Sequence, residues 1–172
     1  IDTPSGVRAI RARRGVVLAA GGFPQDTERR RALFGHAPSG REHWSAAPEE
    51  NNGNGLRLGE AVGARIAVGA EAGAWAPVSL VPRRDGSVGA FPHLVERGKP
   101  GLIAVARDGQ RFVDEAGDYH SFMRGLLAHC AQRLPGEPVQ AWLVVDHRFQ
   151  RRFGLGHAKP RPFPLGPWLR SG

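Results

Sequence analysis

The sequence predicts a mixed α/β fold. The clearest signal is the apolar run Val16–Ala20, which has glycine on both sides and is typical of a strand buried on both faces of a sheet. Two glycines, Gly21 and Gly22, follow this run, and a backbone without side chains can come close to a ligand. Because ligands of open α/β sheets lie at the carboxyl ends of strands, this turn is a candidate binding site. A tight turn after a core strand would explain the same residues.

The first half of the chain is expected to contain further strands and two helices. Asp26 is a good N-cap for a helix that ends near Gly35, because its carboxylate can accept a hydrogen bond from a free N–H of the first turn. A second helix follows Asn51–Gly55, and the free amide groups at a helix start favour anions and ring carbonyls. The other expected elements are a loop over 38–54 and strands over Val7–Ala12, Val16–Ala20 and Ile66–Val68.

The second half of the chain consists mainly of short apolar runs separated by turns. We therefore place the domain boundary near residue 70, giving domains 1–70 and 71–172. Turn signals such as Arg107-Asp108-Gly109 separate short apolar runs there. One longer run has apolar residues at helical spacing. The expected elements are strands over Val78–Pro82, Leu102–Ala106, Phe112–Val113 and Ala141–Val145, and a helix over Ser121–Gln132.

Composition narrows the function classes. The 24 Lys and Arg residues exceed the 16 Asp and Glu residues, for a formal net charge of +8. The arginines are scattered and no nucleic-acid recognition motif accompanies them, so we expect no nucleic-acid partner, with a non-enzymatic basic binding module as an alternative. No apolar run approaches the roughly 20 residues of a membrane-spanning helix. Cys130 is the only cysteine, which excludes an internal disulfide and favours a reducing, cytoplasmic setting.

Three motifs, in this order, resemble those of the fumarate reductase and succinate dehydrogenase flavoprotein superfamily. They are Gly15–Phe23, Asn52–Leu56 at the start of a helix, and Asp108–Glu115. Each motif alone is common, but their order and separations make the likeness specific. The likeness covers nearly the whole chain but only the middle of such a flavoprotein. The chain starts at Ile1 and lacks the G-x-G-x-x-G fingerprint that grips a pyrophosphate, so we expect a piece of a longer protein.

The resemblance implies a fold and a cofactor. Residues 1–70 would be the C-terminal-side portion of an FAD-binding domain, and residues 71–172 a truncated α+β capping domain that closes over a small-molecule substrate. Asn54 stands where the family usually has Asp, which alters one hydrogen-bond acceptor. No metal is expected. The residues implied to bind FAD are Ala20, Gly21, Gly22, Phe23, Asn52, Gly53, Asn54 and Gly55.

The resemblance also singles out Tyr119. Soluble fumarate reductases carry a proton-donating Arg at this position, whereas the 3-ketosteroid dehydrogenase-like branch has a Tyr that acts as a base. In that chemistry the flavin takes a hydride and the base takes the neighbouring proton. A role as a first-turn helix residue would explain Tyr119 without catalysis. Arg111 and Glu115 are expected to pair with neighbouring groups and fix the turn before this helix.

The predicted function is therefore that of a piece of an FAD-dependent oxidoreductase acting on a CH–CH bond of a ketosteroid-like substrate, with Tyr119 as the base. We expect the isolated piece to be inactive. Within the family, the alternative is a fumarate reductase-type reduction of an unsaturated carboxylate. Strand edges without partners promote association, so we also expect the piece to self-associate.

Overall fold

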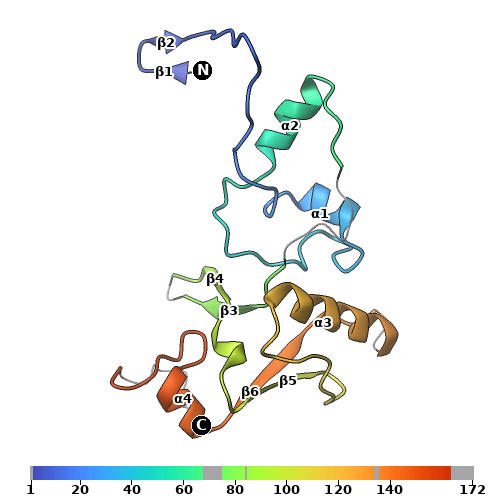
Figure 1. Cartoon of the computed structure of the whole chain (residues 1–172), viewed down its shortest axis with the longest axis vertical. Helices are drawn as coiled ribbons and strands as arrows, with labels where there is room; N and C mark the ends of the chain where they lie inside the picture. The colour runs from blue at the N-terminus through green and yellow to red at the C-terminus, as the bar shows by residue number, and fades with distance from the viewer. Residues whose placement is uncertain (1, 68–74, 84, 134–135, 164–172) are drawn as a thin grey trace.

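The computed structural model describes residues 2–67, 75–83, 85–133 and 136–163. It has the mixed α/β content that the sequence predicts, with three two-stranded antiparallel sheets in the described residues. Figure 1 shows α1 and α2 at one end of the molecule and the elements from β3 to α4 at the other. In chain order the elements are β1 Asp2–Thr3, β2 Gly6–Val7, α1 Thr27–Leu33, α2 Asn54–Ala61, β3 Val78–Pro82, β4 Val88–Pro92, the 3-10 helix η2 Glu96–Gly98, β5 Leu102–Ala106, α3 Tyr119–Arg133, β6 Ala141–Val145 and α4 His147–Phe153.

The strands predicted in the first half do not form. Val16–Ala20 belongs to no sheet, and the side chains of Val16 and Val17 are 75% and 90% exposed. The predicted strand Val7–Ala12 is also wrong, because the pairing in this region joins β1 to β2. The strand predicted over Ile66–Val68 is absent at its first two residues, and its third lies outside the described residues. A strand needs a neighbour for its backbone N–H and C=O groups, and no described strand lies beside these runs.

Both helices predicted in the first half are confirmed. The Oδ1 atom of Asp26 accepts a hydrogen bond of 3.0 Å from the backbone N–H of Arg29, which caps α1 as expected. α1 ends close to Gly35, as predicted. Just after the end of α2, Gly63 has a φ of +79°, a left-handed conformation that glycine adopts without strain.

The strands of the second half are mostly where the sequence places them. β5 pairs with β6 over the two predicted ranges, and β3 matches its prediction. The partner of β3 is β4, which was missed because it contains Gly89 and Pro92, residues that are depleted in strands. Phe112 and Val113 do not form the predicted strand, and Arg111 instead makes a single bridge to Val105.

Two helices complete the second half. α3 includes the predicted helix and begins two residues before it. Its buried residues are Phe122, Leu126 and Cys130, so this face packs against the protein. α4 was not predicted, although Asp146 caps it by accepting a hydrogen bond of 2.7 Å from the N–H of Phe149.

A small aromatic cluster joins the two halves of the chain. The indole ring of Trp75 lies 4.8 Å from the ring of Phe34, measured between centroids. Met123 and Leu127 of α3 pack against the same cluster. α3 is therefore fixed against the end of α1. The predicted boundary at residue 70 lies outside the described residues. Among the helices that the structure describes, none is long and apolar enough to cross a membrane.

Candidate functional site

The structure brings the two predicted glycine motifs together. The backbone N–H of Gly53 donates a hydrogen bond of 3.1 Å to the carbonyl oxygen of Gly22. A Cβ atom added at Gly55 would lie 3.4 Å from the Cβ of Ala20. We call the two adjoining segments, Ala20–Phe23 and Asn52–Gly55, the glycine cradle. Sequence reasoning expected both segments at one ligand, and the fold makes them neighbours.

The two glycines of the first segment have different roles. Gly21 has a φ of +77°, and a Cβ atom there would come within 2.4 Å of the Oδ1 atom of Asn51, so its own chain requires glycine. Gly22 has room, because a Cβ atom would meet only the Cδ of Pro24, at 3.6 Å. Both glycines are exposed. The cradle therefore presents open backbone at Gly22 rather than a sealed turn.

The start of α2 supplies the polar groups of the cradle. The N-cap residue, Gly53, has no side chain with which to cap the helix, so the first N–H groups of α2 lack partners within the helix. The Oδ1 atom of Asn52 is buried and has no hydrogen-bond partner in the described part of the chain. Asn54 is exposed, and its Oδ1 atom accepts a hydrogen bond of 3.2 Å from Arg57. Free helix N–H groups attract a ligand that offers oxygen atoms.

Ion pairs between α1 and α2 hold the cradle in shape. The buried Oδ2 atom of Asp26 lies 2.8 Å from Nη2 of Arg57, so one carboxylate caps α1 and binds α2. Arg29 lies 2.9 Å from the carboxylate of Glu60. The hydrogen bond from Arg29 lowers the pKa of Glu60. Sequence reasoning found Asp26 as a cap but missed these pairs, because no local pattern links α1 to α2.

Tyr119 is the first residue of α3, and its side chain is 39% exposed. Asp118 precedes it and accepts a hydrogen bond of 2.9 Å from the N–H of Ser121. Among the described residues, the hydroxyl group of Tyr119 has no hydrogen-bond partner, and no hydrogen bond or ring contact joins Tyr119 to the glycine cradle. The position of Tyr119 at the start of a helix agrees with a purely structural role. Its hydroxyl group, which has no partner among the described residues, is also available for catalysis.

An ion pair between the exposed Arg111 and the buried Glu115 fixes the turn before Tyr119, as predicted. Nη2 of Arg111 lies 2.5 Å from the carboxylate of Glu115, which also accepts a hydrogen bond of 2.8 Å from the N–H of Ala104. Burial favours a higher pKa for Glu115, but these hydrogen bonds outweigh it and hold the pKa below its usual value. The guanidinium of Arg97 donates a hydrogen bond of 2.9 Å to the carbonyl of Glu115. Arg97 and the Arg111–Glu115 pair hold the turn that leads into α3.

Two histidines pack around Trp75, beside the cradle's Phe23. The Nε2 atom of His36 lies 3.2 Å from Nδ1 of His43, and both rings contact the indole of Trp75. Burial, together with the nearby His36 and Arg30, lowers the pKa of His43 to about 4. Burial also lowers the pKa of His36. Both side chains are therefore neutral near pH 7.

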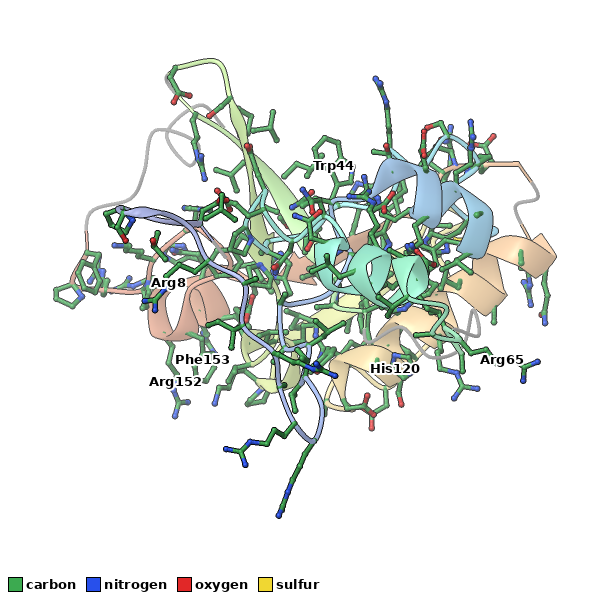
Figure 2. All side chains as sticks on the ribbon, turned by 90° about the horizontal axis from the view of Figure 1, so that it is seen from above. Arg8, Trp44, Arg65, His120, Arg152 and Phe153 are labelled. Carbon is green, nitrogen blue, oxygen red and sulfur yellow. The ribbon has the colours of Figure 1, made fainter. Side chains whose placement is uncertain are left out.

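A cavity of about 570 Å³ lies between Trp75 and α3. His120, labelled in Figure 2, lies on the first turn of α3 and is part of the lining of this cavity. The Nε1 atom of Trp75 and the Nδ1 atom of His120 are buried without hydrogen-bond partners in the described residues. This cavity could not be predicted from the sequence, because its lining comes from α3 and from Trp75, which lies far from α3 in the chain. Tyr119 is not among its lining residues.

Comparison with known proteins identifies the family. Residues 1–155 match the model of a family described as FAD binding domain. The chain belongs to this family. The matched residues include both segments of the glycine cradle, where the exposed backbone meets the free N–H groups at the start of α2.

The chain is also similar to individual enzymes. It is 39% identical over 165 residues to a 4-oxocyclohex-2-ene-1-carboxylate 5-dehydrogenase of Sinomonas cyclohexanicum, covering 95% of this chain and 27% of that protein. It is 36% identical over 166 residues to a 3-oxosteroid 1-dehydrogenase of Mycobacterium tuberculosis, covering 95% and 28%. The chain thus spans a little more than a quarter of the length of these relatives.

A solved structure supports the fold. The crystal structure of 3-ketosteroid delta1-dehydrogenase from Sterolibacterium denitrificans, in complex with 1,4-androstadiene-3,17-dione, matches with a TM-score of 0.67 and 32% identity. The match covers 88% of this chain and 26% of that chain. The arrangement of small sheets and helices is therefore that of part of a ketosteroid dehydrogenase.

The residues of the glycine cradle fit the cofactor of the family. FAD offers phosphate oxygens and ring carbonyls as acceptors, and the first N–H groups of α2 are donors without helix partners. Gly22 leaves backbone exposed, so a flat or extended group can approach it. The unpaired Oδ1 atom of Asn52 offers one acceptor beside these donors. The two segments contain no acidic side chain, and the carboxylate that adjoins them, that of Asp26, is paired with Arg57.

Proposed function

We propose that this chain serves an FAD-dependent oxidoreductase that acts on a CH–CH bond beside a ring ketone. The observation that carries the proposal is the contact between Ala20–Phe23 and Asn52–Gly55 in a chain of the FAD binding domain family. The relatives named above are dehydrogenases of oxosteroids and of an oxocyclohexene carboxylate, which share an oxo group on a ring. We propose that the substrate of this enzyme also carries an oxo group on a ring.

The cradle's part in this function is to bind the cofactor. Bound FAD supplies the hydride acceptor. The exposed backbone at Gly22 and the free N–H groups of α2 would bind it, with Ala20, Gly21, Phe23, Asn52, Gly53, Asn54 and Gly55 shaping the surface. The ion pair between Asp26 and Arg57 holds the two segments of the glycine cradle next to each other.

Tyr119 is the proposed base. Removing the proton beside the departing hydride needs a base within hydrogen-bond reach of the substrate. Tyr119 is 39% exposed, and its hydroxyl group has no hydrogen-bond partner among the described residues, which supports its access to a substrate. The Arg111–Glu115 pair fixes its helix start.

The proposed substrate is ketosteroid-like, as for two of the relatives. Reduction of an unsaturated carboxylate, as in fumarate reductases, is the alternative, and Tyr119 in place of an arginine speaks against it. A purely basic binding module has only the net charge of +8 in its favour. With Cys130 as its single cysteine the chain has no internal disulfide, and this supports our proposal of a cytoplasmic setting.

Purification of the full-length protein that contains this chain tests the proposal. We expect a yellow protein with visible flavin absorbance that bleaches when a cyclic ketone substrate is added without an electron acceptor. A well-folded full-length protein that stays colourless after incubation with FAD would overturn the proposal.

A further inference from the structure

Three side chains from β3, from the residue after β4 and from η2 form a hydrogen-bonded series that the proposed flavin chemistry does not use. The Oγ atom of Ser79 lies 2.6 Å from Nε2 of His93. The Nδ1 atom of the same ring lies 2.5 Å from Oε1 of Glu96. We call Ser79, His93 and Glu96 the Ser79 triad. A serine hydroxyl bonded to a histidine that a carboxylate orients is the arrangement of an activated nucleophile.

The carboxylate of Glu96 determines which ring nitrogen of His93 carries a proton. An ionised carboxylate only accepts hydrogen bonds, so Nδ1 of His93 donates to it. The Nε2 atom is then the acceptor, and the hydroxyl group of Ser79 donates to it. This is the direction that a general base needs in order to take the serine proton.

The β3–β4 hairpin fixes His93 relative to Ser79. Ser79 is opposite Phe91 in the hairpin, and His93 lies two residues farther along, so its side chain leaves the same face as that of Ser79. The N–H of His93 donates a hydrogen bond of 2.8 Å to the carbonyl of Pro77. Its carbonyl accepts one of 2.7 Å from Nε of the buried Arg97. Backbone bonds on both sides therefore hold the base in place.

The triad also has an exposed nucleophile and a nearby backbone donor. Ser79 is exposed, whereas the side chains of His93 and Glu96 are 4% and 17% exposed. The bond from His93 to Pro77 fixes the alternation of the ladder, so the N–H of Leu80 points away from β4. No other strand of the described residues pairs with β3. The N–H of the residue after the nucleophile is a common oxyanion donor in acyl transfer.

The side chains next to His93 are apolar. The ring of Phe91 lies 5.4 Å from the ring of His93, measured between centroids. Leu94 and Val95, which separate His93 from Glu96, are 47% and 70% exposed. Such a surface favours an uncharged substrate with a small apolar acyl group.

We propose that Ser79 is the nucleophile of a second catalytic site, which hydrolyses small uncharged carboxylic esters. The Oγ atom attacks the ester carbonyl carbon while Nε2 of His93 takes the hydroxyl proton. The bond to the leaving alcohol breaks, and His93 gives the proton to this alcohol. Water, deprotonated by the same nitrogen, then releases the carboxylic acid and restores the serine. Ester and water become acid and alcohol with no change of oxidation state, so the reaction needs no flavin.

Labelling and hydrolysis measurements on the full-length protein test this site. Diisopropyl fluorophosphate phosphorylates activated serines with loss of fluoride, and peptide mass spectrometry locates the label. We expect the label on Ser79 and hydrolysis of p-nitrophenyl acetate above the buffer rate. Ser79→Ala should lose the label and lower the hydrolysis rate about a hundredfold. Glu96 is a positioning residue that acts through His93, so Glu96→Gln should lower kcat about tenfold and leave KM unchanged.

Ser87→Ala is the matched control. Ser87 is an exposed serine of the same hairpin, but its hydroxyl group donates a hydrogen bond of 2.7 Å to Asp85 instead of to a histidine. The variant should keep both the label on Ser79 and the hydrolysis rate. A wild-type protein without label on Ser79, or equal hydrolysis by Ser79→Ala and the wild type, would overturn the second site. Turnover of a cyclic ketone without ester hydrolysis would refute this site and keep the proposed function, whereas ester hydrolysis by a protein that binds no flavin would do the reverse.

Discussion

The N–H of Gly53 donates a hydrogen bond of 3.1 Å to the carbonyl oxygen of Gly22, and this bond joins two motifs that lie far apart in the sequence. It places the exposed backbone of the first motif beside the free helix N–H groups of the second. Gly53 has a φ of +85°, and a Cβ atom there would lie 3.2 Å from the Cβ of Phe23. The contact therefore depends on glycine at this position.

Gly53→Ala should destabilise the protein by about 1–2 kcal/mol, because alanine is strained in the left-handed conformation and would crowd Phe23. Urea unfolding measures the change. Gly35→Ala is the control, since Gly35 has no positive φ and a Cβ atom there meets nothing within 4 Å. Equal stability of the two variants would contradict the assigned role of Gly53.

Acid should weaken the cluster around Trp75. Burial, His36 and Arg30 lower the pKa of His43 to about 4, below its value of about 6.5 in the unfolded chain. The unfolded chain therefore binds the proton more tightly, so this contribution to stability is complete above pH 6.5 and declines as the pH falls towards 4. The expected loss is roughly 2 kcal/mol between pH 7 and pH 5.

Unfolding by urea at pH 7 and pH 5 checks this. His43→Phe keeps the ring but cannot be protonated, so its stability should fall less between the two pH values. His147→Phe is the control, because His147 is exposed at the start of α4. If His43→Phe and His147→Phe lose the same stability on acidification, the buried histidine is not the cause.

Tyr119→Phe should lower turnover of a cyclic ketone by about a hundredfold or more, the usual contribution of a general base. Flavin content and melting temperature should not change, because the hydroxyl group of Tyr119 has no hydrogen-bond partner among the described residues. Steady-state kinetics on the full-length protein measures the effect. Unchanged turnover would eliminate Tyr119 as the proton-transfer residue.

The 172-residue chain by itself should self-associate. Val17 is 90% exposed and Val16 is 75% exposed, in a run with the composition of a strand but no described partner. Such runs pair with other chains. Light scattering should give a mass above 18.5 kDa that falls in Val17→Asp. Val95→Asp, at an exposed valine of the second half, should not lower it. A monomeric mass at high concentration would refute this expectation.

Local signals in the sequence predicted much of the fold. The Asp26 cap predicted α1, and the apolar runs of β5 and β6 predicted strands, because each signal acts within its own element. Val16–Ala20 failed as a strand because strand formation depends on a neighbour that local composition does not reveal. β4 was not predicted because it contains Gly89 and Pro92, residue types that are depleted in strands.

The candidate site was predictable in part. The resemblance singled out both segments of the glycine cradle, and the fold makes them neighbours. The ion pair from Asp26 to Arg57 and the cavity at Trp75 could not be predicted, since each joins side chains from separate elements. Only tertiary packing creates such contacts.

The FAD content of a Gly22→Val variant of the full-length protein tests the central claim most directly. A Cβ atom at Gly22 has room in the protein, because its nearest neighbour would be the Cδ of Pro24 at 3.6 Å, and the branched side chain of valine would cover the open backbone of the cradle. We predict that Gly22→Val folds and loses most of its bound flavin, while Gly35→Val keeps about one FAD per chain. Full flavin content in a folded Gly22→Val variant would contradict the account.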